Sequence, residues 1–240
     1  MKRSAKNCEV LINGYKLSTF ATAYEATAGV DSVDVTGFTD GCKNFIPGQK
    51  VASLTADMLW SITAGESNTA LSGLTTGQVT LIPEGYTLGT QSLSMPFMQE
   101  NFSPNGKPDG AIQLGTIKFS SYGNDAGIYF GVALQHGTIT NTLTGTGVLD
   151  PSDAAMTAAC GAVLHVWTAT AADTYVIKVQ HSSDNVNFAD LITFSADGKT
   201  LLAERQTVGS GTINKYRRVL ATRTGAAANP LGFSVHFFTK

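Results

Sequence analysis

The sequence predicts an all-β fold, an antiparallel β-sandwich with one short helix, followed by a second β module. Apolar residues alternate with polar ones in several segments, which is the pattern of half-buried strands. Thr, Val, Ile and aromatic residues fill these segments, as strand propensity favours. Helical patterns are few and short. Together these observations favour packed antiparallel sheets over any helical architecture.

The clearest predicted strand runs from Ala52 to Ile62, where every second residue is apolar. Between Leu114 and Ile117 the alternation shifts by one position at Gly115-Thr116, which indicates a β-bulge. The same alternation predicts three further strands, within residues 128–134, 175–179 and 231–237.

Helices are expected at two places. Glu66–Leu74 has room for two turns, and Asp150-Pro151-Ser152-Asp153 has the cap, proline and acid typical of a helix start before Ala154–Ala159. The segments Gly37–Lys50 and Glu100–Gly110 are rich in Gly and Pro and are expected to be long loops. Loops of this length in a compact domain are usually functional or disordered.

Strand patterning stops before the Gly145–Ser152 segment and begins again at Ala162. We therefore expect a domain boundary near residue 150. Residues 1–150 would form the first β domain and residues 151–240 the second, sandwich-like module.

Charge is unusually sparse, because 14% of the residues are Asp, Glu, Lys or Arg, against about 25% in an average soluble chain. The net charge of −2 argues against a nucleic-acid-binding protein, which uses a basic surface to neutralise phosphates. No apolar run approaches the ~18 residues that a membrane span requires, so no membrane partner is expected.

The amino terminus, Met1-Lys2-Arg3-Ser4, is not followed by the apolar stretch of a signal peptide, so we expect a cytoplasmic site of synthesis. Cys8, Cys42 and Cys160 are too few and too widely separated for a disulfide framework and are expected to be reduced and buried. No closely spaced ligand pair predicts a metal site, and no cofactor is expected.

Candidate chemical motifs have simpler explanations. Gly198-Lys199-Thr200 lacks the earlier glycine of a phosphate-binding loop and is better explained as a hairpin turn. The oxygen-bearing side chains of residues 184–190 do not have calcium-loop spacing and predict a polar loop. In the basic stretch Lys215–Arg218, strand alternation would place Lys215 and Arg217 on the opposite face from Tyr216 and Arg218. We therefore do not expect an enzyme, although a dispersed catalytic triad is set by geometry and not by sequence order.

Two ordered sets of motifs resemble a known family. Val10–Ser18, Val33–Asp40 and Asn44–Lys50, which precede the strand from Ala52, are similar to the N-terminal region of tail tube (major tail) proteins of long-tailed bacteriophages. The segment Val179–Leu191, followed by Tyr216–Val219, resembles the C-terminal part of phage tail proteins of the same type. The sequence departs from the family pattern at Thr39–Cys42 and at Phe188, where the family usually has tryptophan.

The resemblance implies a structural virion protein of the phage tail, assembled in the host cytoplasm. Its β-sandwich or half-barrel tube domain would close into rings, and the rings would stack into a channel for genome DNA. The rings would be hexameric, or trimeric if both modules are tube domains. The implied partners are further copies of the chain, other tail proteins, and DNA that passes through without specific binding. Heterologous contacts of this kind stack without an end.

The loop at Gly37–Lys50 is the candidate contact with a neighbouring subunit or ring, with Phe38, Phe45, Ile46 and Pro47 as its apolar anchors. Alternatively, these four residues only pack the loop onto their own domain.

Two other functions of the protein stay open. One is a binding module on the virion surface that recognises carbohydrate or a receptor, with aromatic residues lining a groove: Trp167, Tyr122 and Tyr129. The other is a capsid decoration or head–tail joining protein.

Overall fold

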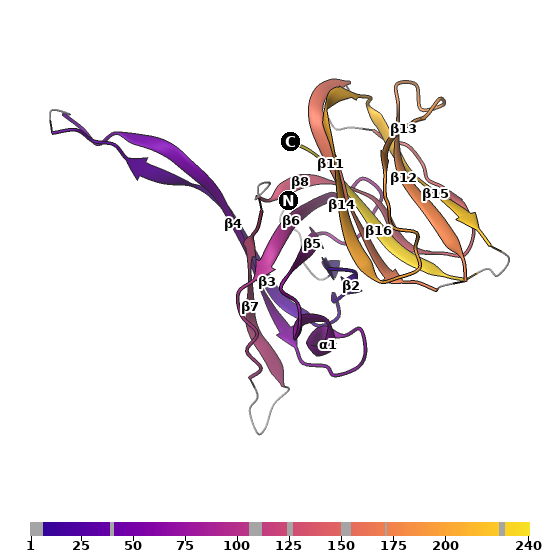
Figure 1. Cartoon of the computed structure of the whole chain (residues 1–240), viewed down its shortest axis with the longest axis horizontal. Helices are drawn as coiled ribbons and strands as arrows, with labels where there is room; N and C mark the ends of the chain where they lie inside the picture. Colours follow the sequence, from indigo (N-terminus) through magenta and orange to yellow (C-terminus); the bar gives the residue numbers. More distant parts are fainter. Residues whose placement is uncertain are drawn as a thin grey trace. The chain divides into compact units, whose positions relative to one another are not determined.

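The computed structural model describes residues 7–38, 41–105, 112–123, 127–149, 155–170, 172–225 and 229–240. In these residues the chain is an antiparallel all-β protein with one short helix and two sheets, which confirms the predicted fold class (Figure 1). The chain divides into two compact units that are interleaved along the sequence. Unit 1 contains Met1–Thr19, Gly77–Ser94 and Tyr129–Lys240, and unit 2 contains Phe20–Thr76 and Met95–Ile128.

The predicted boundary near residue 150 falls on residues outside the described ranges. The division into domains 1–150 and 151–240 stays a prediction.

Unit 1 holds most of the strands. Its first sheet includes, in spatial order, β14 (Leu202–Ile213), β11 (Met156–Thr168), β16 (Leu231–Thr239), β8 (Tyr129–Ile139) and the start of β6 (Gln91–Gln99). Its second sheet contains β13 (Ala189–Thr193), β12 (Thr174–Ser182), β15 (Tyr216–Thr224), β10 (Val148–Leu149) and β9 (Leu143–Thr144). A short ribbon is formed by β1 (Glu9–Ile12), β2 (Tyr15–Lys16) and β5 (Thr76–Ile82).

The main core of unit 1 lies between its two sheets. Tyr175 and Ile177 of β12 project from one sheet, and Leu164 of β11 and Phe233 of β16 project from the other, all into one buried cluster. The alternation predicted for residues 175–179 is confirmed, because Tyr175, Ile177 and Val179 are all buried. At roughly 25 cal/mol per Å² of apolar surface removed from water, this sandwich core is a major source of the unit's stability.

Strand β16 is buried on both faces, which simple alternation does not predict. Its second face carries polar side chains, and each finds a partner. Ser234 donates to the carbonyl of Gln135, and the hydroxyl of Ser92 contacts Nδ1 of His236. On the neighbouring strand, Nε2 of His165 lies 2.9 Å from the hydroxyl of Thr80. These pairings let the sheet bury its second face, because buried polar groups need hydrogen-bond partners.

Unit 2 is built on β3 (Ala21–Asp34), β4 (Phe45–Leu59), β7 (Gln113–Ser121) and the end of β6, with the helix α1 (Ser67–Leu71). Its core includes Phe97 and Phe119, whose ring centroids lie 4.7 Å apart at a steep angle. The hydroxyl of Ser67 at the start of α1 donates to the carbonyl of Leu59 at 2.6 Å, which ties the helix to β4.

The predicted strand at Ala52–Ile62 is confirmed as far as Leu59, with every second residue from Ala52 to Met58 buried. The β-bulge at Gly115 is also confirmed, because the register between β4 and β7 slips there. The helix expected at Glu66–Leu74 is present but shorter. In β8, Phe130 is exposed, and the alternation predicted there is interrupted by a register shift against β16.

Three expectations are corrected. Gly37–Lys50 is not one long loop, because Phe45–Lys50 form the start of β4. Residues Met156–Ala159 are in β11 and not in a helix, since pairing with β14 overrides their local preference; Asp150–Ala154 lie outside the described residues. The three cysteines are free thiols, but Cys42 is exposed and Cys8 half-buried, so only Cys160 is buried as expected.

Candidate functional site

The outer half of the β3–β4 hairpin, residues 27–51, is the candidate functional surface and is called the arm below. From Ser53 to Leu59, β4 is paired on both sides, with β3 and with β7. Beyond Ser53, in the described part of unit 2, β4 pairs with β3 alone, so the arm is a two-stranded ribbon (Figure 1). Every described residue from Thr27 to Val51 is exposed.

A polar network holds the end of the ribbon together. The backbone N–H of Val35 donates to the carbonyl of Asn44 at 2.9 Å, and the N–H of Asn44 donates to the hydroxyl of Thr36 at 2.9 Å. The hydroxyl and backbone N–H of Thr36 both donate to Asp34, which holds the pKa of that carboxyl below its usual value. The two strands are therefore closed by defined hydrogen bonds up to the turn.

A bulge interrupts the arm at Gly48 and Gln49, next to Pro47. Val30 pairs with Lys50 and Ser32 with Pro47, so Asp31 of β3 faces two residues of β4. Proline has no N–H to donate and a bulge disturbs the ladder, and natural edge strands use both devices against unwanted pairing. The β4 edge is thus poorly suited to open-ended sheet extension. A contact between the arm and another chain would therefore be made by side chains and not by backbone pairing.

The four predicted anchors all lie on the arm. Phe38 is in the turn with its side chain fully exposed, at 113% of the reference value, and Phe45 and Ile46 are 50% and 51% exposed. Pro47 is exposed as well. All four side chains are exposed, and their role in a contact between subunits stays a prediction.

The structure does not bring the four anchors into one patch. Residues that face each other in register share a face of the ribbon, and side chains alternate along each strand. Ile46 pairs with Val33 on one face, whereas Phe45 and Pro47 lie on the other face, and Phe38 projects at the tip. The arm therefore presents apolar groups on two faces and at its end.

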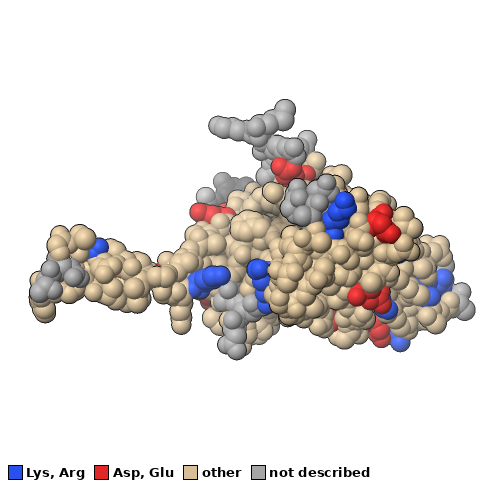
Figure 2. All heavy atoms as spheres, turned by 90° about the horizontal axis from the view of Figure 1, so that it is seen from above, with Lys and Arg blue, Asp and Glu red and all other residues tan. Residues whose placement is uncertain are grey.

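Sequence reasoning missed several exposed apolar residues of the same arm, all of them valines: Val30, Val33, Val35 and Val51. The signal available in the sequence was the recurrence of valine along this segment. The charged residues in the described part of the arm are Asp31, Asp34, Lys43 and Lys50. Figure 2 shows the arm as largely uncharged on the face in view.

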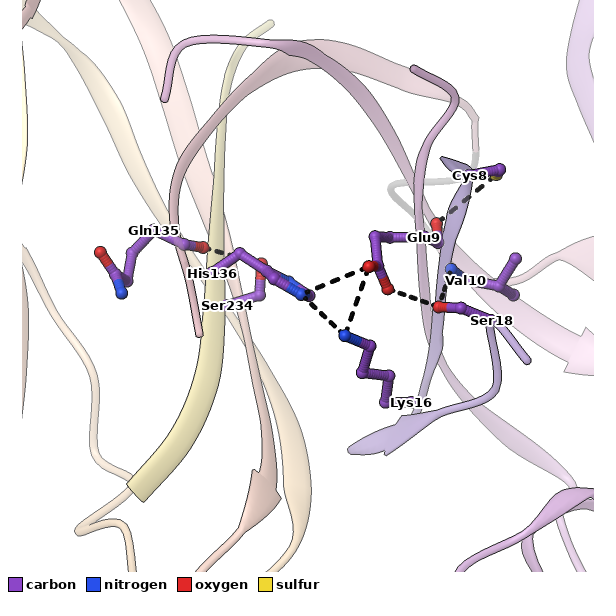
Figure 3. A network of polar contacts seen from close by, with 8 residues as sticks. All are labelled: Cys8, Glu9, Val10, Lys16, Ser18, Gln135, His136 and Ser234. Carbon is purple, nitrogen blue, oxygen red and sulfur yellow. Dashed lines mark hydrogen bonds and ion pairs between the residues drawn. The ribbon is translucent and has the colours of Figure 1, made fainter. Parts of the chain in front are cut away.

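A second polar cluster lies in unit 1, where β1, β2 and β8 meet (Figure 3). The ammonium of Lys16 is 3.3 Å from Oε1 of Glu9 and 3.2 Å from Nε2 of His136. Ser18 donates to the other carboxylate oxygen of Glu9 at 2.5 Å. The ring of His136 also stacks against Trp167, with ring centroids 4.7 Å apart.

This cluster has a structural role, because it joins β1 and β2 to β8. Burial lowers the pKa of His136 to about 4, so the imidazole is neutral near pH 7 and accepts a hydrogen bond from Lys16. Each charged group of the set has a partner within the set. The cluster joins residues 120 positions apart, which is why sequence reasoning did not find it.

The other motifs behave as local structure. Asp184 accepts hydrogen bonds from the backbone N–H groups of Val186 and Asn187, which confirms a polar loop. The side chain of Asp197 accepts from the N–H of Lys199 at 3.1 Å, as expected of a turn. In the described part of the chain, no group of three or more His, Cys, Asp or Glu residues is placed to hold a metal ion.

The basic stretch is divided as predicted. Arg217 is buried, with its guanidinium 4.9 Å from the ring centroid of Phe237. Arg218 instead lies over Phe188, 3.8 Å from the ring centroid. The two guanidinium groups therefore do not combine into one basic surface. Separately, none of the described helices is long and apolar enough to cross a membrane.

Two of the aromatic residues of the alternative carbohydrate groove lie apart within unit 1. Tyr129 stacks on Phe238 at one end of β16, and the indole of Trp167 lies near Gly232 at the other end. Tyr122 belongs to unit 2.

No protein-family model matches this chain, and no curated protein matches its sequence. Its fold is similar to that of a chain in the virion of a native gene transfer agent particle, with 15% identity and a TM-score of 0.40 over 54% of this chain and 98% of the other.

Two further solved structures give similar results. A chain from the tail of an empty gene transfer agent particle, refined with C6 helical symmetry, has 15% identity and a TM-score of 0.41, again over 54% of this chain and 98% of the other. The Dit protein of SPP1, from the hub adsorption apparatus of phages that infect Gram-positive bacteria, has 12% identity and a TM-score of 0.35 over 96% and 99%. These similarities concern the arrangement of strands and assign no role to any residue.

Proposed function

We propose that this chain is a structural subunit of a phage-type tail tube, which self-assembles into stacked rings. The observation that carries the proposal is the arm, a two-stranded ribbon with exposed apolar side chains on both faces and at its tip. The arm coincides with the motifs that resemble the tail tube family, at Val33–Asp40 and Asn44–Lys50.

An isolated two-stranded hairpin is marginally stable in water, so an arm of this kind gains most from a partner. Full burial of an exposed side chain such as Phe or Ile is worth roughly 1.5–3 kcal/mol. Because Phe38 is fully exposed and Phe45 and Ile46 about half exposed, burying all three gives a gross gain of about 3–6 kcal/mol. Association itself costs about 4–15 kcal/mol, so one arm contact is too weak to hold two copies firmly. Stable assembly requires several contacts per subunit, as rings and stacks provide.

The charge distribution supports a channel that DNA crosses without being held. The chain carries a net charge of −2, and its densest basic stretch is divided between a buried Arg217 and a separate Arg218. Each phosphate bound by a basic side chain would add to affinity through counterion release and slow the transit of DNA. In the assembled tail the partners are other copies of the chain, in hexameric or trimeric rings, and other tail proteins.

Electron microscopy of negatively stained protein at high concentration tests this proposal. We expect rings or tubes of uniform bore from the native chain, and folded monomers from the double variant Phe45→Ser, Ile46→Asp. Val186→Asp is the matched control, because Val186 is 75% exposed in a loop of unit 1. We expect this variant to assemble as the native chain does. Tubes from the double variant would remove the arm from the interface, and a persistent native monomer would contradict the proposal. Single rings that never stack would favour a joining or decoration protein.

A further inference from the structure

Side chains, not backbone pairing, hold the β1–β2 hairpin against the first sheet of unit 1. In the described part of the unit, β2 pairs with β1 alone and lies beside β11, which is itself paired on both sides, with β14 and β16. Here Gly14 and Lys16 of the hairpin meet three side chains of the sheet, those of His165 and Trp167 in β11 and His136 in β8. These five residues are called the seam.

The two histidines of the seam are hydrogen-bond acceptors toward the hairpin. A backbone N–H and an ammonium can only donate. The N–H of Gly14 donates to Nδ1 of His165 at 3.4 Å, and the ammonium of Lys16 donates to Nε2 of His136 at 3.2 Å. Nε2 of His165 then carries the proton and donates to the hydroxyl of Thr80 in β5. Both imidazoles are therefore neutral when the seam is closed.

A second proton on either ring turns its acceptor into a donor. At His165 an N–H would then face the N–H of Gly14, and at His136 an imidazolium would face an ammonium. His236 on β16 is different, because its Nδ1 contacts the hydroxyl of Ser92, and a hydroxyl can accept as well as donate. The seam therefore tolerates protonation less well than the contact of His236 does.

The charged groups around His136 act in both directions. Oε1 of Glu9 lies 3.7 Å from its Nε2, and Glu84 lines the same cleft together with Tyr86. Glu9 favours the protonated imidazole, and the ammonium of Lys16 opposes it. Burial outweighs the attraction and lowers the pKa of His136 to about 4.

His165 is enclosed more completely. The neighbouring strands place His236 of β16 and Arg205 of β14 on the same face of the sheet, both in register with Val163. Arg205 is a cation and a protonated His236 would be another, so neither favours a proton on His165. Burial lowers the pKa of His165 to about 3.

The face of the sheet behind the seam is polar. Besides His165, its buried side chains include Thr80, Ser92, Ser94, Ser234 and His236. The sandwich core on the opposite face is apolar, and none of these histidines belongs to it. Opening the seam would therefore leave the contacts of the sandwich core in place.

We propose that the seam opens in acid: protonation of His165 and His136 releases the β1–β2 hairpin from β11 and β8, while the sandwich core stays folded. This conformational response goes beyond the proposed function and does not depend on it. In the open seam both pKa values return to about 6.5, so the closed form is stable above that pH and is lost as the pH falls toward the folded values. Between about pH 7 and about pH 4.5 the opening equilibrium should shift about 10³–10⁴-fold toward the open form.

Hydrogen exchange of single amides, measured by NMR on the dilute native chain at these two pH values, tests the proposal. The reporter is the amide of Gly14, because its hydrogen bond ends on His165, and the reference is the amide of Ile177, whose side chain lies in the sandwich core. After correction for the intrinsic exchange rate at each pH, protection of Gly14 should fall about 10³–10⁴-fold, and Ile177 should stay more strongly protected. Equal protection of the two amides at the lower pH would show that acid unfolds unit 1 as a whole. That result, or unchanged protection of Gly14, would overturn the proposal.

Three variants assign the response to the seam. His165→Gln and His136→Gln each keep an acceptor for the hairpin but take up no proton, so each should reduce the fall in Gly14 protection roughly 50–100-fold. His181→Gln is the matched control, because His181 accepts from the N–H of Asn214 outside the seam, and the fall should be unchanged. The full fall in both seam variants would overturn the assignment.

A second measurement leaves the histidines intact. Trp60→Phe makes Trp167 of the seam the one tryptophan of the chain. Quenching of its fluorescence by acrylamide should rise as the pH is lowered, while the circular dichroism of the sheets is retained. Constant quenching would show that the seam stays closed in acid and would overturn the proposal.

Discussion

Three buried histidines show how single residues set the chain's response to pH. His165 lies between the hydroxyl of Thr80 and the backbone N–H of Gly14, which donates to Nδ1 at 3.4 Å. Burial lowers the pKa of His165 and of His236 to about 3, and that of His136 to about 4. All three side chains are neutral in the folded protein near pH 7.

We predict that acid destabilises the folded chain through these histidines. In the unfolded state their pKa values return to about 6.5, so the unfolded chain binds protons below that pH while the folded chain does not. Stability is complete above about pH 6.5 and falls as the pH is lowered toward the folded values. Between about pH 7 and pH 5 the loss amounts to roughly 2 kcal/mol per histidine.

Urea titrations at the two pH values measure this effect, in the non-assembling Phe45→Ser, Ile46→Asp background so that association does not contribute. His165→Gln keeps an acceptor for Gly14 and a donor for Thr80. It should reduce the pH-dependent loss by roughly a quarter to a third, since it removes one of these three groups and burial also lowers the pKa of the fourth histidine, His181. A loss that is unchanged in His165→Gln would contradict the assignment.

At the scale of elements, the turn between β1 and β2 depends both on its local sequence and on packing against another strand. Asn13 and Gly14 both have positive φ, 47° and 85°, which is the geometry of a tight type I′ hairpin. A Cβ on Gly14 would lie 2.5 Å from the backbone nitrogen of Leu202 at the start of β14. Gly14 therefore allows both the turn and the close approach of another strand.

We predict that Gly14→Ala destabilises the chain more than Gly65→Ala does. Gly65 has nearly the same φ, 82°, but open space around its Cβ position. The control should lose about 1 kcal/mol from backbone strain alone. Gly14→Ala should lose about 1–3 kcal/mol more, because strand backbone must move. Denaturation midpoints measure the difference, and equal losses would show that β14 adjusts freely.

Elements were predictable where burial selects one face. From Ala52 to Met58, β4 has one buried and one wet face, and alternation located it correctly. In the arm both faces are exposed, so alternation has nothing to select, and Pro47-Gly48 was taken for part of a loop. The strand at Met156–Ala159 was assigned to a helix, because its pairing with β14, some 50 residues later, is not visible locally.

The candidate site was predictable only in part. Phe38, Phe45, Ile46 and Pro47 were found through the family resemblance, and all of them are exposed on the arm. The polar cluster of Glu9, Lys16 and His136 was not found, because it joins residues 120 positions apart that meet only through tertiary packing.

At the scale of the whole molecule, sparse charge becomes a property of the assembly. Only 14% of the residues are charged, and the net charge is −2. Little electrostatic repulsion therefore opposes the association of copies, since net charge far from zero is what keeps proteins apart. The exposed apolar side chains of the arm favour association, and electrostatic repulsion opposes it only weakly.

We predict that assembly is driven by apolar burial and is nearly indifferent to simple salt. Raising sodium chloride from about 50 to about 500 mM screens exposed charges, so it should change the critical concentration no more than about threefold, the contribution expected of a single exposed ion pair. Ammonium sulfate should lower the critical concentration steeply, because sulfate is excluded from apolar surfaces and strengthens their burial. Light scattering measures both responses. The Phe45→Ser, Ile46→Asp variant should stay monomeric in either salt, and dissociation of native assemblies by sodium chloride would show that ion pairs, not the apolar anchors, hold the copies together.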